Sequence, residues 1–292
     1  DPDIFMKDYL NSYTNDSIRK EVANAAKNLT VRRSINFTNV RKEKGTGKSK
    51  SHIYDVENLS LTYAYSEIYM RDINVNRDFT KNYKGGLGYN FNPSPKNYAP
   101  LSKVPFLGKS KFFALAKDFN FYLLPRQIAF RTDINRMYNE RVMRNNYPDI
   151  VAQMDTFINK NFFWIRAYDL KYDITKALKF DFQATNNSLI GEPDGRVDKK
   201  GEDENYSEWQ DSVKYSIAKF GKTTDYRHNA NLNYTLPLSK IPLTDWLNST
   251  AQYSATYNWM RAPFAADTLG HTIQNSRSLQ INGTGNMLTV YN

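Results

Sequence analysis

Residues Leu247–Trp259, LNSTAQYSATYNW, alternate between two kinds of side chain along almost their whole length. A period of two is that of a β-strand, whose successive side chains point to opposite faces. The stretch is longer than the five or six residues typical of a soluble strand and suits the roughly 9–11 residues of a membrane-spanning strand. One face is apolar (Leu247, Ala251, Tyr253, Ala255, Tyr257, Trp259) and the other polar (Asn248, Thr250, Gln252, Ser254, Thr256, Asn258).

The same alternation recurs about nine times, with turn residues between the segments. Such a rhythm is typical of a β-barrel or a β-sandwich, so we predict an all-β fold with antiparallel strands. The other predicted strands are 31–38, 59–66, 86–91, Arg126–Glu140, Phe162–Ile174, Leu178–Leu189, Asp225–Leu236 and a weaker one over Thr272–Gly283.

Short helical segments are predicted outside this pattern. Residues 1–28 form a helical lead-in, because Thr14–Ser17 supplies N-cap candidates and an apolar stripe follows (Ile18, Val22, Ala25, Ala26, Leu29). Residues 29–292 then hold the strands, with inserts near 93–118, 145–160 and 191–222. A helix after Pro148 is predicted from Ile150, Val151, Met154, Phe157 and Ile158, and another from Tyr206, Trp209, Val213 and Ile217.

The composition excludes several classes of protein. Among 292 residues there is no Cys, which excludes disulfides, thiolate zinc sites, iron–sulfur clusters and a Cys nucleophile. No apolar run reaches the 18 or more residues of a spanning helix, whereas barrel strands remain possible. The net charge of +10 comes from dispersed Lys and Arg, which argues against nucleic acid. Because the chain begins at Asp1 without Met, we expect a piece of a longer protein.

No catalytic pattern stands out, so we predict a protein that is not an enzyme and uses no cofactor or metal. Gly45–Ser49 (GTGKS) looks like the tail of a phosphate-binding loop, but position 42 is Lys rather than Gly. The three histidines, His52, His228 and His271, lack metal-ligand spacing. The carboxylates Asp133, Asp169, Asp173 and Asp181 are better interpreted as lumen or rim charge than as an acid–base pair.

Several longer stretches resemble the SprA/Sov family, the giant outer-membrane translocon of the type IX secretion system. The similarity covers roughly residues 29–292, in the family's order. It is carried by Tyr83–Lys96 (YKGGLGYNFNPSPK), Leu123–Asn135 (LLPRQIAFRTDIN), Tyr168–Lys176 (YDLKYDITK), Tyr234–Trp246 (YTLPLSKIPLTDW) and Tyr253–Trp259 (YSATYNW). Two positions depart from the family pattern: Ile165, where an acidic residue is expected, and Gly191, before Glu192.

The resemblance implies an arc of a very large antiparallel transmembrane β-barrel with short helical inserts, in the bacterial outer membrane of Bacteroidetes. It implies protein secretion, and gliding motility in gliding species. The expected partners are outer-membrane lipid, a PorV-like shuttle barrel, a periplasmic plug protein and secreted proteins with type IX C-terminal signals. Alternatives are another outer-membrane transporter barrel and a soluble β-sandwich that binds glycans.

The two faces of the predicted strands give the candidate site residues. A polar lumen wall would hydrate cargo without sticky apolar patches, whereas apolar side chains would meet lipid. The predicted lumen-facing residues are Arg131, Asp133, Asn135, Gln252, Ser254 and Thr256, and the predicted lipid-facing residues are Tyr253, Ala255, Tyr257 and Trp259.

Overall fold

A computed structural model describes residues 5–43, 52–104, 114–146, 154–197, 204–241 and 243–286. Its helices are α1 (Met6–Asn11), α2 (Asp16–Ala26), α3 (Ala114–Lys117) and α4 (Glu204–Ala218), with short 3-10 turns between strands. Its strands are β1 (Leu29–Val40), β2 (Leu59–Arg71), β3 (Val75–Phe91), β4 (Asn97–Tyr98), β5 (Phe121–Tyr122), β6 (Gln127–Met143), β7 (Thr156–Asp173), β8 (Leu178–Leu189), β9 (Lys222–Leu236), β10 (Leu247–Met260) and β11 (Thr272–Gly285).

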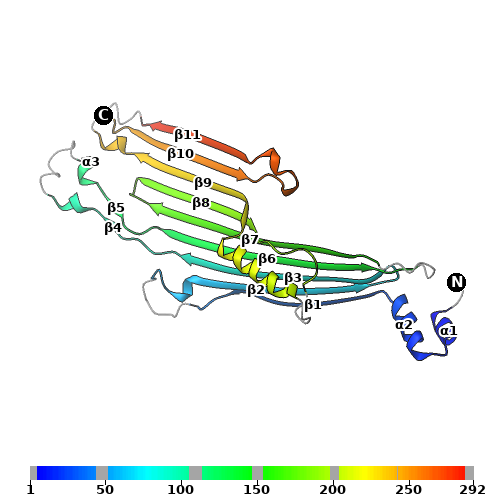
Figure 1. Cartoon of the computed structure of the whole chain (residues 1–292). Coiled ribbons are helices and arrows are strands. Elements are labelled where there is room, and N and C mark those ends of the chain that lie inside the picture. The colour runs from blue at the N-terminus through cyan, green and yellow to red at the C-terminus, as the bar shows by residue number, and fades with distance from the viewer. Residues whose placement is uncertain are drawn as a thin grey trace.

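Nine of these strands form one antiparallel sheet in the order β1-β2-β3-β6-β7-β8-β9-β10-β11 (Figure 1). They are 12 to 18 residues long. The two-residue strands β4 and β5 pair separately. This arrangement confirms the prediction of a mostly antiparallel β fold. Within the described residues the sheet is open, because β1 and β11 each pair on one side only.

The register of the sheet places the alternating side chains of neighbouring strands in continuous rows. On β10, Tyr253 lies opposite Leu232 of β9 and Leu279 of β11. Ser254 lies opposite Asn231 and Ser278 in the same way. One side of the sheet, the aromatic face, therefore collects the Tyr, Phe, Leu and Trp side chains, and the opposite side, the polar face, collects Asn, Gln, Ser and Thr.

The sheet is a single layer with very little core. The accessible surface of the chain is 21281 Å², whereas a compact chain of this mass would expose roughly 13,000 Å². The principal buried apolar cluster lies under α4, where Phe162, Ile190 and Val213 pack with Ile134, Trp164 and Trp209. A soluble sheet normally buries its apolar face against a second layer. In the described part of the chain, α4 covers only a small part of that face.

Three local expectations need correction. The apolar stripe of the first predicted helix ends earlier than expected: α2 stops at Ala26, and Leu29 is the first residue of β1. Phe157 and Ile158 were predicted on a helix, but both lie on β7, because the backbone of Thr156–Lys160 pairs with β6. The residues 148–153 of that predicted helix lie outside the described part of the chain. β3 begins at Val75, well before the predicted start near 86.

Two helical expectations are confirmed. The helix α2 begins after Asn15, whose side chain accepts a hydrogen bond of 2.8 Å from the backbone N–H of Ser17. This is the N-cap predicted from the polar cluster before the helix. The predicted helix around Trp209 and Val213 is α4, and both residues pack toward the sheet.

Candidate functional site

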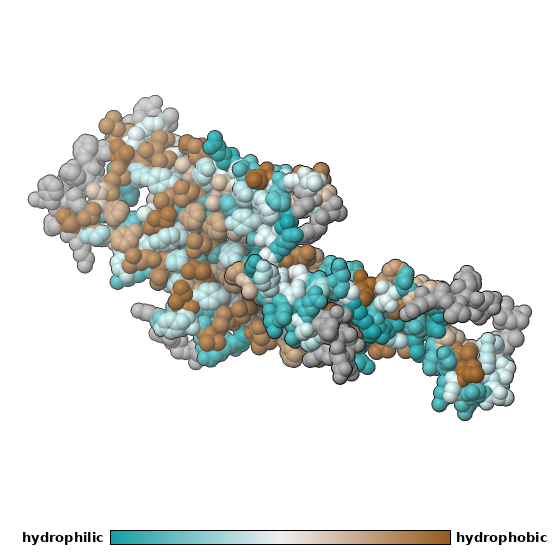
Figure 2. Space-filling model, in the orientation of Figure 1, coloured by the Kyte–Doolittle hydropathy of each residue, from teal (hydrophilic) through white to brown (hydrophobic). Residues whose placement is uncertain are grey.

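The aromatic face carries a continuous apolar band along one half of the sheet. Figure 2, viewed from the side on which α4 lies, shows hydrophobic residues gathered over this half and hydrophilic residues over the other. The band is unusually exposed: Phe37 keeps 56%, Leu61 53% and Leu279 66% of its surface accessible. Its members are Ile35, Phe37, Leu59, Leu61, Tyr63, Leu87, Tyr89, Phe91, Ile128, Phe130, Tyr168, Leu170, Tyr172, Leu178, Phe180, Phe182, Ala230, Leu232, Tyr234, Ala251, Tyr253, Ala255, Leu279 and Ile281.

The sequence-predicted site residues fall on opposite sides of the sheet. Asp133 of β6 lies opposite Ile165, which lies opposite Asn187, and this row continues through Asp225 to Met260 of β10. The register therefore puts Arg131, Asp133 and Asn135 on the same face as Gln252, Ser254 and Thr256. Tyr253, Ala255, Tyr257 and Trp259 lie on the aromatic face. Which solvent meets each face stays a prediction.

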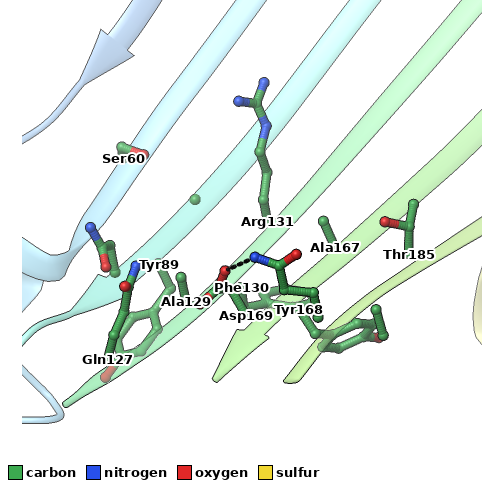
Figure 3. A pocket seen from close by; sticks show the side chains of 14 residues that line it. Ser60, Tyr89, Gln127, Ala129, Phe130, Arg131, Ala167, Tyr168, Asp169 and Thr185 are labelled. Carbon is green, nitrogen blue, oxygen red and sulfur yellow. Dashed lines mark hydrogen bonds between the residues drawn. The ribbon is translucent and has the colours of Figure 1, made fainter. Parts of the chain in front are cut away.

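A hollow of about 400 Å³ lies on the polar face, on the side of the sheet opposite the apolar band. Small residues form part of its lining, among them Gly88 and the two alanines Ala129 and Ala167, which Figure 3 labels. At its rim Gln183 Nε2 donates to Asp169 Oδ2 at 3.0 Å, the bond drawn in Figure 3. The hollow offers hydrogen bonds and charge, but no pair of groups arranged for proton transfer or nucleophilic attack.

An ion pair extends beside this hollow. Arg131 Nε donates to Asp133 Oδ2 at 2.6 Å, and its Nη2 donates to Oδ1 at 3.1 Å. The Arg131 side chain stays 68% exposed, whereas that of Asp133 is 24% exposed. Together with Asn135, which lies on the same face, these side chains form a polar, charge-balanced surface.

Beyond the band, the strands β2, β3, β6 and β7 continue into a segment we call the polar end. It comprises Glu67–Arg71, Val75–Lys81, Arg136–Met143 and Thr156–Phe162, and it lies past the point where β8 stops pairing with β7. Here the aromatic face is no longer mainly apolar. Charged side chains replace the apolar row, with Glu67 and Lys81 opposite each other and Arg136 next to them.

The charges on the aromatic face of the polar end form a buried network. Arg136 Nη2 lies 2.7 Å from Glu192 Oε1, and their side chains are only 18% and 5% exposed. Trp209 Nε1 of α4 donates to the same Glu192 oxygen at 2.5 Å. Glu140 pairs with Arg77 and accepts from the hydroxyl of Tyr138. Sequence reasoning missed this network, because its ion pairs, Arg136 with Glu192 and Arg77 with Glu140, join residues more than fifty positions apart.

Lys160 belongs to the same network. Its Nζ donates to the backbone carbonyl of Pro193 at 2.5 Å. Burial lowers the pKa of Lys160, and the nearby positive charge of Arg136 lowers it further, whereas Glu192 acts in the opposite direction. The 190–197 segment is thus held on the sheet by several polar contacts rather than by apolar packing alone.

The polar face remains polar at this end. Asp78 accepts from Arg141 Nη2 at 2.6 Å and from Asn139 Nδ2 at 2.7 Å. Asn139 also donates to Thr80 Oγ1 at 2.8 Å. At the polar end both sides of the sheet therefore carry charged and amide side chains, with Phe157 exposed among them on the polar face, whereas over the rest of the sheet such side chains gather mainly on the polar face.

The residues considered for chemistry lie apart from one another. His228 stacks on Tyr257 with ring centroids 5.2 Å apart, His271 Nδ1 accepts from the backbone N–H of Ala262, and His52 lies near Asp55. Within the described ranges, no three His, Cys, Asp or Glu side chains come together as metal ligands. Gly45–Ser49 lies outside those ranges. Among the described helices, none is long and apolar enough to cross a membrane.

Compared with models of known protein families and with curated protein sequences, the chain matches none.

Proposed function

We propose that this chain is an arc of an outer-membrane protein-conducting β-barrel of the type IX secretion kind, with the apolar band toward lipid and the polar face toward the lumen. The resemblance to the SprA/Sov family motivates the choice of secretion system. The observation that carries the barrel geometry is one sheet of nine long antiparallel strands with a single exposed apolar face.

The position of the band supports a bilayer as its covering, because it crosses all nine strands on one face of the sheet. On β8 and β9 its members span five residues each, Leu178–Phe182 and Ala230–Tyr234, or about 17 Å at 3.3–3.4 Å per residue. Strands of 12 to 18 residues also exceed what a soluble sandwich needs, so the strand lengths favour a membrane barrel over the glycan-binding alternative.

The polar face suits the passage of a folded protein. Its rows of Asn, Gln, Ser and Thr on β9, β10 and β11, such as Gln252, Ser254 and Thr256, can hydrogen-bond water and offer little apolar surface to which cargo would adhere. The proposed mechanism is passive, and the barrel would work with a PorV-like shuttle barrel and a periplasmic plug protein. The cargo would be proteins that carry type IX C-terminal signals.

A crosslinking experiment tests this proposal. A photoreactive amino acid is placed at Gln252 or at its neighbour Tyr253 in the full-length protein, and a cargo protein is stalled during export. We expect cargo crosslinks from position 252 and lipid adducts, without cargo, from position 253. Cargo crosslinks from neither position, with normal assembly, would contradict the secretion proposal and favour a transporter for small solutes.

The chain in isolation provides a second test. An open sheet with two edges and an exposed apolar face should aggregate in water or require detergent. Monomeric sedimentation in buffer, together with a sharp thermal transition, would contradict the membrane setting and favour a soluble protein.

A further inference from the structure

The two ends of helix α4 expose different kinds of side chain. In the first part of the helix the exposed side chains include Glu208 and Asp211, whereas the last turns expose Lys214 and Tyr215, and Lys219 is exposed directly after the helix ends. Tyr215 keeps 61% and the following Phe220 60% of its surface accessible, and Ile217 is exposed as well. Large apolar side chains and lysines therefore gather at one end of the helix.

The packing of α4 orients this end toward the apolar band. Trp209, in the first half, contacts Glu192 and Arg136 at the polar end. Phe220, after the last turn, stacks on Trp164 with ring centroids 5.8 Å apart. Since β7 runs from Lys160 through Trp164 to the band residue Tyr168, the helix descends from the polar end to the edge of the band. In Figure 1 it is the yellow helix that crosses the sheet.

The backbone after α4 is held in a costly conformation. Phe220 has φ 61° and Gly221 has φ 71°, and a left-handed backbone is unfavourable for a bulky residue such as Phe. Arg166 Nη2 donates to the carbonyl of Phe220 at 3.1 Å, and its guanidinium lies 5.4 Å from the Phe220 ring centroid. These contacts fix an aromatic ring that stays largely exposed.

We propose that the C-terminal end of α4 is an interfacial anchor: Tyr215, Ile217 and Phe220 insert at the boundary between headgroups and acyl chains, and Lys214 and Lys219 meet anionic headgroups. The inference rests on the proposed membrane setting of the apolar band. It adds the position along the strands at which the bilayer ends. Aromatic rings with adjacent lysines are the side chains that favour this boundary. The acidic N-terminal half would remain in water.

Site-directed spin labelling tests the anchor. Tyr215→Cys and Asp211→Cys, one helical turn apart and both exposed, each receive a nitroxide in the full-length protein in outer-membrane vesicles. This chain contributes no other thiol, because it has no Cys. Collisions with oxygen report acyl chains, and collisions with a polar nickel complex report water. We expect a several-fold higher oxygen-to-nickel accessibility ratio at position 215 than at position 211.

Labels at Tyr253→Cys and Gln252→Cys separate the failure of the anchor from the failure of the proposed function. If position 253 favours oxygen while 215 favours nickel as 211 does, the anchor is wrong and the membrane setting stands. If 215 is shielded from both reagents, a protein covers the helix and the lipid anchor is again wrong. If 253 and 252 both favour nickel, the membrane setting itself fails.

Discussion

The apolar band and the polar end belong to the same strands, yet only the band distinguishes the two faces of the sheet. On β6, Ile128 and Phe130 of the band give way to Arg136 and Glu140 on the same face, while the opposite face is mostly polar along the strand, with Ala129, Met137 and Met143 between its polar residues. The backbone ladder continues unchanged across this boundary. The comparison teaches that strand length and side-chain character are separable: backbone hydrogen bonding sets how long a strand is, and the side chains set how much of it is apolar. In the proposed membrane setting, only the apolar part would meet lipid.

The largest expected effect is on the aromatic face of the band. Ala255→Arg places a charge among the band residues, where an Arg near the bilayer midplane costs about 2–4 kcal/mol. Ser254→Arg, its neighbour on the polar face, keeps the charge hydrated. We expect strongly reduced outer-membrane abundance of the first variant and near-normal abundance of the second, measured beside wild type. Equal abundance of the two would mean that the faces are assigned wrongly.

The same substitution at the polar end sharpens the boundary between the two regions. Ile158 lies on the aromatic face opposite Glu140, so Ile158→Arg introduces its charge beside a carboxylate and outside the band. Its outer-membrane abundance should exceed that of the Ala255→Arg variant. A loss as severe at position 158 would place lipid over the polar end as well.

A smaller effect is expected inside the polar network. Glu192→Gln keeps an acceptor for Trp209 but leaves Arg136 without its partner charge, which should weaken the docking of α4 by about 2–3 kcal/mol. Hydrogen exchange of the α4 amides measures the loss. Lys214→Gln is the control, because its 3.9 Å pair with Asp211 is exposed and contributes little. Equal exchange in the two variants would rule out a stabilising role for the network.

The next largest loss of stability is expected at Gly221, in the turn that joins α4 to β9. A Cβ at Gly221 would lie 3.0 Å from the carbonyl oxygen of Leu189 and 3.1 Å from Ile190 Cδ1, and the position has a positive φ. Gly221→Ala should therefore destabilise the α4 segment by about 1–2 kcal/mol. Gly191→Ala, where nothing lies within 4 Å, serves as the matched control. Hydrogen exchange as fast in the control as in the test variant would contradict this account.

The smallest expected effect is a pH dependence at Lys160. Because burial lowers its pKa, the folded protein releases this proton at a lower pH than the unfolded chain, whose Lys titrates near 10.4. The free energy of opening should therefore rise as the pH increases between those two values. Comparing the opening of the 190–197 segment in wild type and Lys160→Met isolates the contribution. The wild-type increase should be absent in the variant; identical pH profiles would show that Lys160 titrates normally.

The boundary between band and polar end also explains which strands the sequence predicted. β8 and β10 lie along the band, where a clean alternation exists, and their predicted bounds agree with the structure to within a residue. The first half of β3, Val75–Lys84, mixes charged and polar residues on both faces. Because charged residues such as Arg77 and Lys81 share a face with Phe79, the period-two hydropathy signal disappears, and the start of the strand could not be predicted.

For the candidate site, the two faces of a single strand could be predicted from the sequence, whereas the alignment of one strand with another could not. The opposition of Ser254 and Ala255 follows from alternation alone, and any strand conformation produces it. The alignment of Asp133 with the polar side of β10 requires the register of the intervening strands, which no local pattern specifies. The pairing of Arg136 with Glu192 depends on where the 190–197 segment folds back, so only the three-dimensional arrangement reveals it.

The order of the nine-stranded sheet follows the order of the chain, and this has a consequence for assembly and evolution. Each strand of this sheet pairs with its sequence neighbours among the nine, the longer connections being the one through β4 and β5 between β3 and β6 and the one through α4 between β8 and β9. Contacts between near neighbours in sequence close short loops and form early in folding. Such a sheet can grow one hairpin at a time, and a duplicated or deleted hairpin leaves the register of every other pair unchanged.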